Sequence, residues 1–309
     1  MTISSTNSVV FLMGPTASGK TELALEMYNQ LDASLISVDS ALIYRGMDIG
    51  TAKPSKVTLE NYPHALIDIC EPDESFSVNQ FVSLAKQHIE SALNAGKLPI
   101  LVGGTSFYFN ALEHGLSKLP ESTKDSRKYF NDRLKNQGSE KLHSQLLKID
   151  PTSATRIHPN DSQRVTRALE VFHLSGVTLS ELQGNKNENK LNHEIKKIIL
   201  MPDRSELHQR IEQRFIEMIK DGFLDEVETL RKNKNLNLDL ASMRCVGYRQ
   251  AWNYFDGLYS KQEMIEKAII ATRQLCKRQC TWLRNENDAL ILDKANIDSV
   301  INFLQERGA

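Results

Sequence analysis

The residues best suited to chemistry lie near the start of the chain, in the sequence GPTASGKT. Gly14, Gly19, Lys20 and Thr21 fit the pattern G-x-x-x-x-G-K-[ST], in which backbone N–H groups, an ammonium and a hydroxyl surround linked phosphates. The two glycines allow the backbone to approach the phosphates, and a helix starting near Lys20 directs its positive end toward them. The pattern predicts a phosphate-binding loop with Mg²⁺ bound through Thr21. The predicted loop consists of Gly14, Pro15, Thr16, Ala17, Ser18, Gly19, Lys20 and Thr21.

The loop pattern does not identify the phosphate compound. Nucleotide-binding and ATP-binding proteins share it, so a kinase for a small metabolite is one hypothesis. In kinases and GTPases, an apolar strand ending in a magnesium-binding aspartate completes the site. Two aspartates compete for that role here, Asp39 after the run LISV and Asp68 in HALIDIC.

Polar residues follow two further apolar runs. Asp39 and Ser40 end the second run, and Thr105 follows the paired glycines of LVGGTSFYFNAL. Ligands of open α/β sheets bind at the carboxyl ends of strands, which favours a role for these residues at the site. Aspartate and threonine also cap helices, so simple capping remains an alternative for Asp39 and Thr105.

The chain alternates short apolar runs with helical patterns, which indicates βαβ units and a parallel sheet. One helix is predicted over 77–94, with a capping box of Ser77 and Gln80 and a stop at Gly96. Strands are predicted at 8–13, 35–38, 65–69, 98–102, 195–200 and 289–292, and further helices at 205–221, 223–232 and 262–284.

The segment 118–180 is polar and helical and contains no strand-like run. Sheet-forming segments normally follow one another closely, so this segment is predicted to be an inserted helical domain. Pro120 and the run GNKNENK at 184–190 are its expected hinges. The expected domains are a core of 1–117 and 181–309 and an insertion of 118–180.

Composition narrows the class of protein. The formal net charge is −1, so a nucleic-acid partner needs a local basic patch. The cysteines lack CxxC spacing and the histidines lack HExxH spacing, which indicates reduced thiols rather than a metal centre. The chain shows no signal peptide and no apolar run of 18 residues. We expect a soluble cytoplasmic protein that has no membrane partner and acts as a monomer.

Six motifs together resemble the tRNA dimethylallyltransferase (IPP transferase) family. They are GPTASGKT, SVDSALIYRGMDIGTAKP, LVGGTSFYFNAL, IHPNDSQRVTRALEVF, RCVGYRQAW and TRQLCKRQCTWLR, in the family's order along nearly the whole chain. The zinc finger of some eukaryotic members is missing, because the 25 residues after Arg284 contain no Cys or His. The resemblance implies a P-loop NTPase-like parallel sheet flanked by helices, with an inserted all-helical domain.

The resemblance also implies a reaction. A dimethylallyl group passes from dimethylallyl diphosphate to N6 of the adenosine at position 37, beside the anticodon of tRNA. Lys20, Mg²⁺ and the loop amides would stabilise the departing diphosphate, and Asp39 would take the proton from N6. Thr105 would bridge diphosphate and substrate. Arg214 matches a diphosphate-binding arginine, although Arg210 on the same helix face competes for that assignment.

The same resemblance implies a tRNA-binding set that would grip the anticodon stem-loop, with the helical insertion as a clamp. One part of it is a basic stripe, Arg273, Lys277 and Arg284, on the face of the last long helix opposite Ala271, Leu275 and Trp282. A solvated helix face is the alternative interpretation of that stripe. The full set is Asp39, Ser40, Ala41, Leu42, Thr105, Arg127, Gln163, Arg164, Val165, Thr166, Arg167, Arg244, Cys245, Val246, Gly247, Tyr248, Arg249, Lys277, Arg278, Gln279, Cys280, Thr281, Trp282, Leu283 and Arg284.

Two other functions compete with this one besides the metabolite kinase. A prenyltransferase for free adenylates would need neither a basic helix nor a long insertion. A non-catalytic RNA-binding protein would not need Asp39 and Thr105 at the phosphate end of the sheet.

Overall fold

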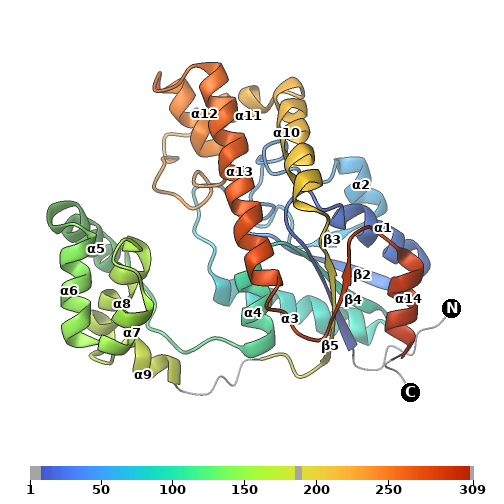
Figure 1. Ribbon diagram of the computed structural model, residues 1–309, viewed down its shortest axis with the longest axis horizontal. Coiled ribbons are helices and arrows are strands. Elements are labelled where there is room, and N and C mark those ends of the chain that lie inside the picture. Colours follow the sequence, from blue (N-terminus) through green and yellow to red (C-terminus); the bar gives the residue numbers. More distant parts are fainter. Residues whose placement is uncertain (1–7, 185–189, 307–309) are drawn as a thin grey trace. The chain divides into compact units, whose positions relative to one another are not determined.

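The computed structural model describes residues 8–184 and 190–306 and divides into two compact units (Figure 1). The first unit runs up to Glu113 and resumes at Leu191, and the second spans His114–Lys190. The helical unit therefore begins four residues before and ends ten residues after the predicted 118–180. Pro120 lies inside this unit, and residues 185–189 of the other expected hinge lie outside the described residues.

The first unit is built on a sheet of six parallel strands in the order β3-β2-β4-β1-β5-β6. Every strand pair is parallel, which confirms the predicted α/β class. β1 lies between β4 and β5, with Val10 opposite Ile100 on one side and Lys196 on the other. The strands are β1 (Ser8–Met13), β2 (Ala33–Val38), β3 (His64–Ala65), β4 (Leu98–Gly103), β5 (Glu194–Leu200) and β6 (Ala289–Leu292).

The third strand is shorter than the predicted 65–69. Backbone angles end it, because Leu66 and Asp68 adopt φ values of 66° and 54° in the left-handed region. Asp68 consequently lies in a turn, whereas Asp39 directly follows a strand.

Helices cover both faces of the sheet. Val10 and Leu12 of β1 pack in one cluster with α1 (Lys20–Gln30) and α14 (Ile297–Glu306). Phe11, which points to the opposite face, contacts Phe109 of α4 (Ser106–His114) with ring centroids 5.0 Å apart. α3 (Val78–Asn94) covers this second face beside α4 and begins with the predicted capping box of Ser77 and Gln80.

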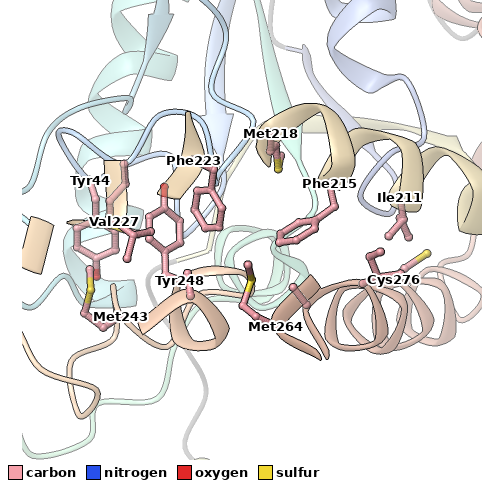
Figure 2. Close-up of a cluster of buried hydrophobic side chains, with 14 of the residues drawn as sticks. Tyr44, Ile211, Phe215, Met218, Phe223, Val227, Met243, Tyr248, Met264 and Cys276 are labelled. Atoms are coloured by element: carbon pink, nitrogen blue, oxygen red, sulfur yellow. The ribbon is translucent and has the colours of Figure 1, made fainter. Parts of the chain in front are cut away.

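Four helices of the C-terminal region form a second hydrophobic cluster, drawn in Figure 2. Phe215, Phe223 and Tyr248 are three of its buried rings, and they meet edge to face. This packing holds α10 against α13 (Figure 1). The helices are α10 (Arg204–Lys220), α11 (Phe223–Arg231), α12 (Tyr248–Phe255) and α13 (Lys261–Leu283).

The loop before α2 (Lys56–Asn61) is fixed to this cluster by Glu226 of α11. Its carboxylate accepts hydrogen bonds from the backbone N–H groups of residues 48–50 at 2.9, 2.7 and 3.2 Å, and from the Tyr248 hydroxyl at 2.6 Å. A Cβ on Gly50 would lie 2.3 Å from the Phe223 ring, so only glycine fits there. Tyr248 is thus a core residue.

The second unit contains only helices among its described residues, as predicted for the insertion. Buried Glu170 accepts hydrogen bonds from Ser122, Ser126 and Arg167, which fastens the unit's first segment to α8. The helices are α5 (Lys124–Gln137), α6 (Ser139–Ile149), α7 (Pro151–Arg156), α8 (Ser162–Ser175) and α9 (Leu179–Gly184). In the described part of both units, no helix has the length and apolar character needed to cross a membrane.

Candidate active site

The Gly14–Thr21 loop connects β1 to α1, as the sequence pattern requires. A Cβ on Gly14 would lie 2.5 Å from the Leu200 carbonyl oxygen of β5, so the close approach of two backbones demands glycine. Gly19 has φ 93° and immediately precedes the first turn of α1. The loop amides therefore surround the positive end of a helix, which is an anion-binding arrangement.

The Lys20 ammonium lies over the loop. It donates hydrogen bonds to the Pro15 carbonyl at 2.7 Å and to the Ser18 hydroxyl at 3.3 Å. Burial lowers the pKa of Lys20 to about 8, although Asp39 acts in the opposite direction. A cation with this pKa is charged at neutral pH and poorly solvated, so an arriving polyanion gains much from it.

Two side chains from separate helices hold Thr16. Arg214 of α10 donates to its hydroxyl at 2.5 Å, and the Gln279 carbonyl oxygen of α13 accepts from its N–H at 2.9 Å. Arg210 donates to the carbonyls of Ala17 and Ser18 at 3.4 and 3.3 Å. Both competing arginines therefore reach the loop, Arg214 at a side chain and Arg210 at the backbone.

Asp39 directly follows β2, and its Oδ1 accepts from the N–H groups of Ala41 at 2.8 Å and Leu42 at 3.4 Å. Burial raises the pKa of the Asp39 carboxyl above its ordinary value, against the opposing effects of these hydrogen bonds and of Lys20. The Thr105 hydroxyl accepts from the Ser40 N–H at 3.1 Å. The turn that begins at Asp39 is thus hydrogen-bonded to Thr105 of the turn after β4. The raised pKa makes the Asp39 carboxylate a better base.

Asp68 has a structural partner instead. Its Oδ1 lies 2.5 Å from the ammonium of Lys53, whose side chain is 3% exposed and also contacts Asp48. Of the two aspartates left open by the sequence, Asp39 lines the cavity described next.

One cavity of about 1370 Å³ joins the loop to the strand ends, and all its lining residues belong to the first unit. Its polar wall includes Lys20, Thr21, Asp39, Thr105 and Arg214. Apolar side chains of α10 and the segment before α12 form another part of the wall: Ile211, Phe215, Met218, Cys245 and Val246. The arrangement can hold an anion and an apolar group in the same space.

The structure distributes the predicted tRNA-binding residues of the first unit unequally. The cavity wall contains Asp39, Ser40, Ala41, Leu42, Thr105, Arg244, Cys245, Val246, Arg278, Gln279 and Trp282. Exposed residues away from the wall are Arg249, Lys277, Thr281 and Arg284, and Cys280 is half-buried. Gly247, with φ 93°, precedes α12.

Two residues of that set are corrected by their burial. Tyr248 is 0% exposed and bonds to Glu226, and Leu283 is 3% exposed. Their side chains belong to the hydrophobic core and are not available to RNA.

The predicted basic stripe on α13 is also corrected. The charge of Arg273 is neutralised, because its guanidinium pairs with the Glu212 carboxylate at 2.6 Å. Leu275 and Trp282 do not form the packed face of the helix but line the cavity, while Cys276 and Leu283 are buried. The apolar residues of α13 thus serve two surroundings: some pack into the hydrophobic core and others line the cavity. Helix periodicity alone does not separate the two groups.

The helical unit exposes some of its predicted RNA contacts. Arg127 and Gln163 are exposed, and the Arg164 side chain is 74% exposed. Val165 is fully buried, so its side chain belongs to the core of the helical unit and cannot reach RNA. Thr166 bonds back to the Ser162 carbonyl. Arg167 is committed to the carbonyl of Pro120, the Ser122 hydroxyl and Glu170.

The sequence motifs place Gln279 in the predicted tRNA-binding set but do not reveal its contact with Thr16. Glu226 and Tyr108 are not among the predicted site residues. Tyr108 lies close enough to Asp39 that the carboxylate adds to burial in raising the pKa of its phenol to about 12. These residues act across long sequence separations, and no local pattern marks them.

Within the described residues, no group of three or more His, Cys, Asp or Glu side chains is placed to hold a metal ion. Thr21 is exposed in the cavity beside the Lys20 side chain, so its hydroxyl is accessible to a cation. A hard cation such as Mg²⁺ would therefore need oxygens from the bound phosphates and from water in addition to Thr21.

Comparison with known proteins gives a consistent result. The family model described as IPP transferase matches residues 42–286. A protein named tRNA dimethylallyltransferase from Ruthia magnifica is 61% identical over 304 residues, covering 98% of this chain and 99% of that protein. Its namesake from Methylococcus capsulatus is 50% identical over 92% of both chains.

Solved structures agree. A full-length tRNA isopentenylpyrophosphate transferase from Bacillus halodurans is 34% identical, with a TM-score of 0.70 over 97% of both chains. A eukaryotic dimethylallyltransferase described as acting on tRNA is 26% identical, with a TM-score of 0.77 over 95% of this chain and 75% of that one.

Proposed function

The chain belongs to the IPP transferase family, and we propose that it transfers a dimethylallyl group from dimethylallyl diphosphate to N6 of adenosine 37 in tRNA. One observation carries the proposal: the Gly14–Thr21 loop, Asp39 and Thr105 line a single cavity that also has an apolar wall. A phosphate-binding loop, a base and an apolar surface are the three requirements of a prenyl donor and an amine acceptor.

The diphosphate is proposed to bind the loop amides, with Lys20 and Arg214 as its cationic contacts. The lone pair of N6 attacks the allylic carbon, the carbon–oxygen bond breaks with its electrons, and diphosphate leaves. Charge builds on the leaving group in the transition state, where preorganised cations and amides contribute several kcal/mol. Lys20, poorly solvated in the cavity, is well suited to this role.

Asp39 is proposed to accept the N6 proton as the new carbon–nitrogen bond forms. Its raised pKa strengthens it as a base, and its hydrogen bonds from Ala41 and Leu42 fix the carboxylate's orientation. Thr105, whose hydroxyl accepts from the Ser40 N–H, would hold the turn that carries Asp39 in place relative to the bound diphosphate.

The cation proposed at this site is Mg²⁺, held by Thr21 and by the donor's own phosphates. When bound it would neutralise part of the leaving-group charge. ATP presents the same linked phosphates and is expected to compete for the loop. A complete cavity lined by one chain supports a monomer as the active species, and a tRNA substrate fits a cytoplasmic location.

The test is incubation of the protein with unmodified tRNA, dimethylallyl diphosphate and Mg²⁺, followed by mass spectrometry of the nucleosides. We expect one adenosine per reactive tRNA to gain a C5H8 unit, and the Lys20→Ala variant to give a greatly reduced yield. Modification of free AMP but not tRNA would indicate an adenylate prenyltransferase. ATP hydrolysis or phosphate transfer without prenylation would indicate a kinase.

A further inference from the structure

Gln279 connects two segments of the site that lie far apart in sequence. Its carbonyl oxygen accepts from the N–H of Thr16 at 2.9 Å, and its amide nitrogen donates to the carbonyl of Gly104 at 2.9 Å. One side chain on α13 thereby bonds both to the phosphate-binding loop and to the turn after β4.

The contact between Gln279 and the turn after β4 requires glycine at position 104. A Cβ on Gly104 would lie 2.5 Å from the Gln279 amide nitrogen and 3.2 Å from the Gly14 carbonyl oxygen. The paired glycines of the turn thus make room for the amide and for the loop. Because any larger residue at position 104 would collide with the Gln279 amide, the contact between the two depends on glycine at this position.

The turn held by Gln279 carries the acceptor side of the proposed reaction. Thr105 follows Gly104, and its hydroxyl accepts from the N–H of Ser40, the residue after Asp39. The bonds therefore run from Thr16 through Gln279 and Gly104 to Thr105 and the Asp39 turn. A shift of the amide would change the spacing between the donor loop and the proposed base.

We propose that Gln279 is a positioning residue that sets the distance between the donor loop and the Thr105 turn, rather than an RNA contact. The proposal rests on the proposed function. It differs from the tRNA role implied by the family resemblance, because both ends of the Gln279 amide already bond to protein. Its neighbours Lys277 and Arg278 on α13 are exposed and remain available to RNA.

The experiment compares wild type with Gln279→Met, which keeps the length of the side chain and removes both hydrogen bonds. Gln274→Met is the matched control, because Gln274 is an exposed glutamine on the same helix. The measurements are KM for dimethylallyl diphosphate, kcat, Kd for tRNA and melting temperature. We expect Gln279→Met to raise donor KM and lower kcat, together reducing kcat/KM about 10-fold or more, which corresponds to 1.4 kcal/mol or more.

The readouts separate the alternatives. A merely destabilised enzyme has fewer active molecules, which lowers kcat and melting temperature but leaves donor KM unchanged. A lost RNA contact raises the Kd for tRNA and leaves donor KM unchanged. Either result, or a Gln279→Met enzyme equal to the control, overturns the proposal. Failure of wild type itself to prenylate tRNA would overturn the proposed function instead.

Discussion

At the scale of single residues, the candidate site contains a lysine and an aspartate that are both poorly solvated. Burial shifts the two groups toward their neutral forms: it lowers the pKa of Lys20 to about 8 and raises that of Asp39. The shifts move both groups' titrations closer to neutral pH. Each shift leads to an observable pH dependence.

For Lys20, kcat/KM with respect to the prenyl donor should fall as pH rises through about 8, because the free enzyme then loses the ammonium charge. Lys20→Arg should lower the value at neutral pH but remove this basic limb, since the guanidinium stays protonated. Steady-state kinetics over a pH series checks both profiles. An unchanged limb in Lys20→Arg would assign it to another group.

For Asp39, the amide variant Asp39→Asn should lower kcat about 100-fold or more while tRNA and donor affinities stay close to wild type. A carboxyl whose pKa is raised in the folded state costs stability when it ionises, and that cost disappears as pH falls below the folded pKa. The neutral amide removes the cost, so the melting temperature at neutral pH should not decrease.

Kinetics and thermal unfolding of the same Asp39→Asn preparation test this prediction. A kcat reduced less than threefold, together with a lower melting temperature, would mean that Asp39 only caps the turn through Ala41 and Leu42.

At the scale of elements, sequence patterns correctly predicted the helices, loops and strands whose formation depends mainly on neighbouring residues. Capping by Ser77 and glycine-bounded loops marked α3 and the Gly14–Thr21 loop, and apolar runs located the sheet strands. The early end of β3 was not predictable, because the left-handed backbone at Leu66 and Asp68 depends on distant contacts such as that of Lys53. The burial of Tyr248 and Leu283 was not predictable for the same reason, because it depends on contacts with residues far away in the sequence.

Two arginines of α8 in the helical unit allow a structural role to be distinguished from an RNA-binding role. Arg167→Ala leaves the buried Glu170 without its cation and should destabilise the protein by roughly 1–3 kcal/mol. Although burial acts to raise it, the pKa of Glu170 is held low by hydrogen bonds from Ser126, Ser122 and Arg167. The stability lost in Arg167→Ala should therefore be present in wild type above the ordinary glutamate pKa and fade on acidification.

Arg164→Ala is the matched variant, because its side chain is 74% exposed and makes one long ion pair of 3.4 Å. It should change stability by less than about 0.5 kcal/mol and weaken tRNA binding. Thermal unfolding and tRNA affinity of both variants test whether Arg167 is structural and Arg164 binds RNA. Equal destabilisation by the two substitutions would contradict the assigned division of roles.

At the scale of the whole molecule, charge is distributed unevenly although the net charge is −1. Residues 114–190 contain 13 lysines and arginines against nine acidic residues, while the chain has 38 against 39. The first unit is therefore acidic overall, and phosphate contacts there must come from a few local cations. At the C-terminal end of α13 the exposed cations are Lys277 and Arg278, with Arg284 directly after the helix, whereas Arg273 is neutralised by Glu212.

The last prediction concerns two of these cations. In the double variant Lys277→Ala/Arg284→Ala, tRNA affinity should fall by a similar factor for every tRNA sequence, and the slope of log K against log salt should flatten by roughly one unit per lost contact. Both side chains are exposed, so stability should change by less than about 0.5 kcal/mol. The donor KM should not move, since neither residue lines the cavity.

Lys261→Ala is the control, because this exposed lysine begins the same helix, roughly 24 Å from Lys277 at 1.5 Å per residue. It removes a charge of the same sign while leaving the far end of α13 intact. Affinities measured over a salt series for the three proteins give the answer. If the double variant matches wild type in both affinity and slope, the exposed face of α13 is only solvated surface, and the tRNA phosphates are bound elsewhere. If Lys261→Ala flattens the slope as much, the effect reflects overall charge rather than a contact with RNA.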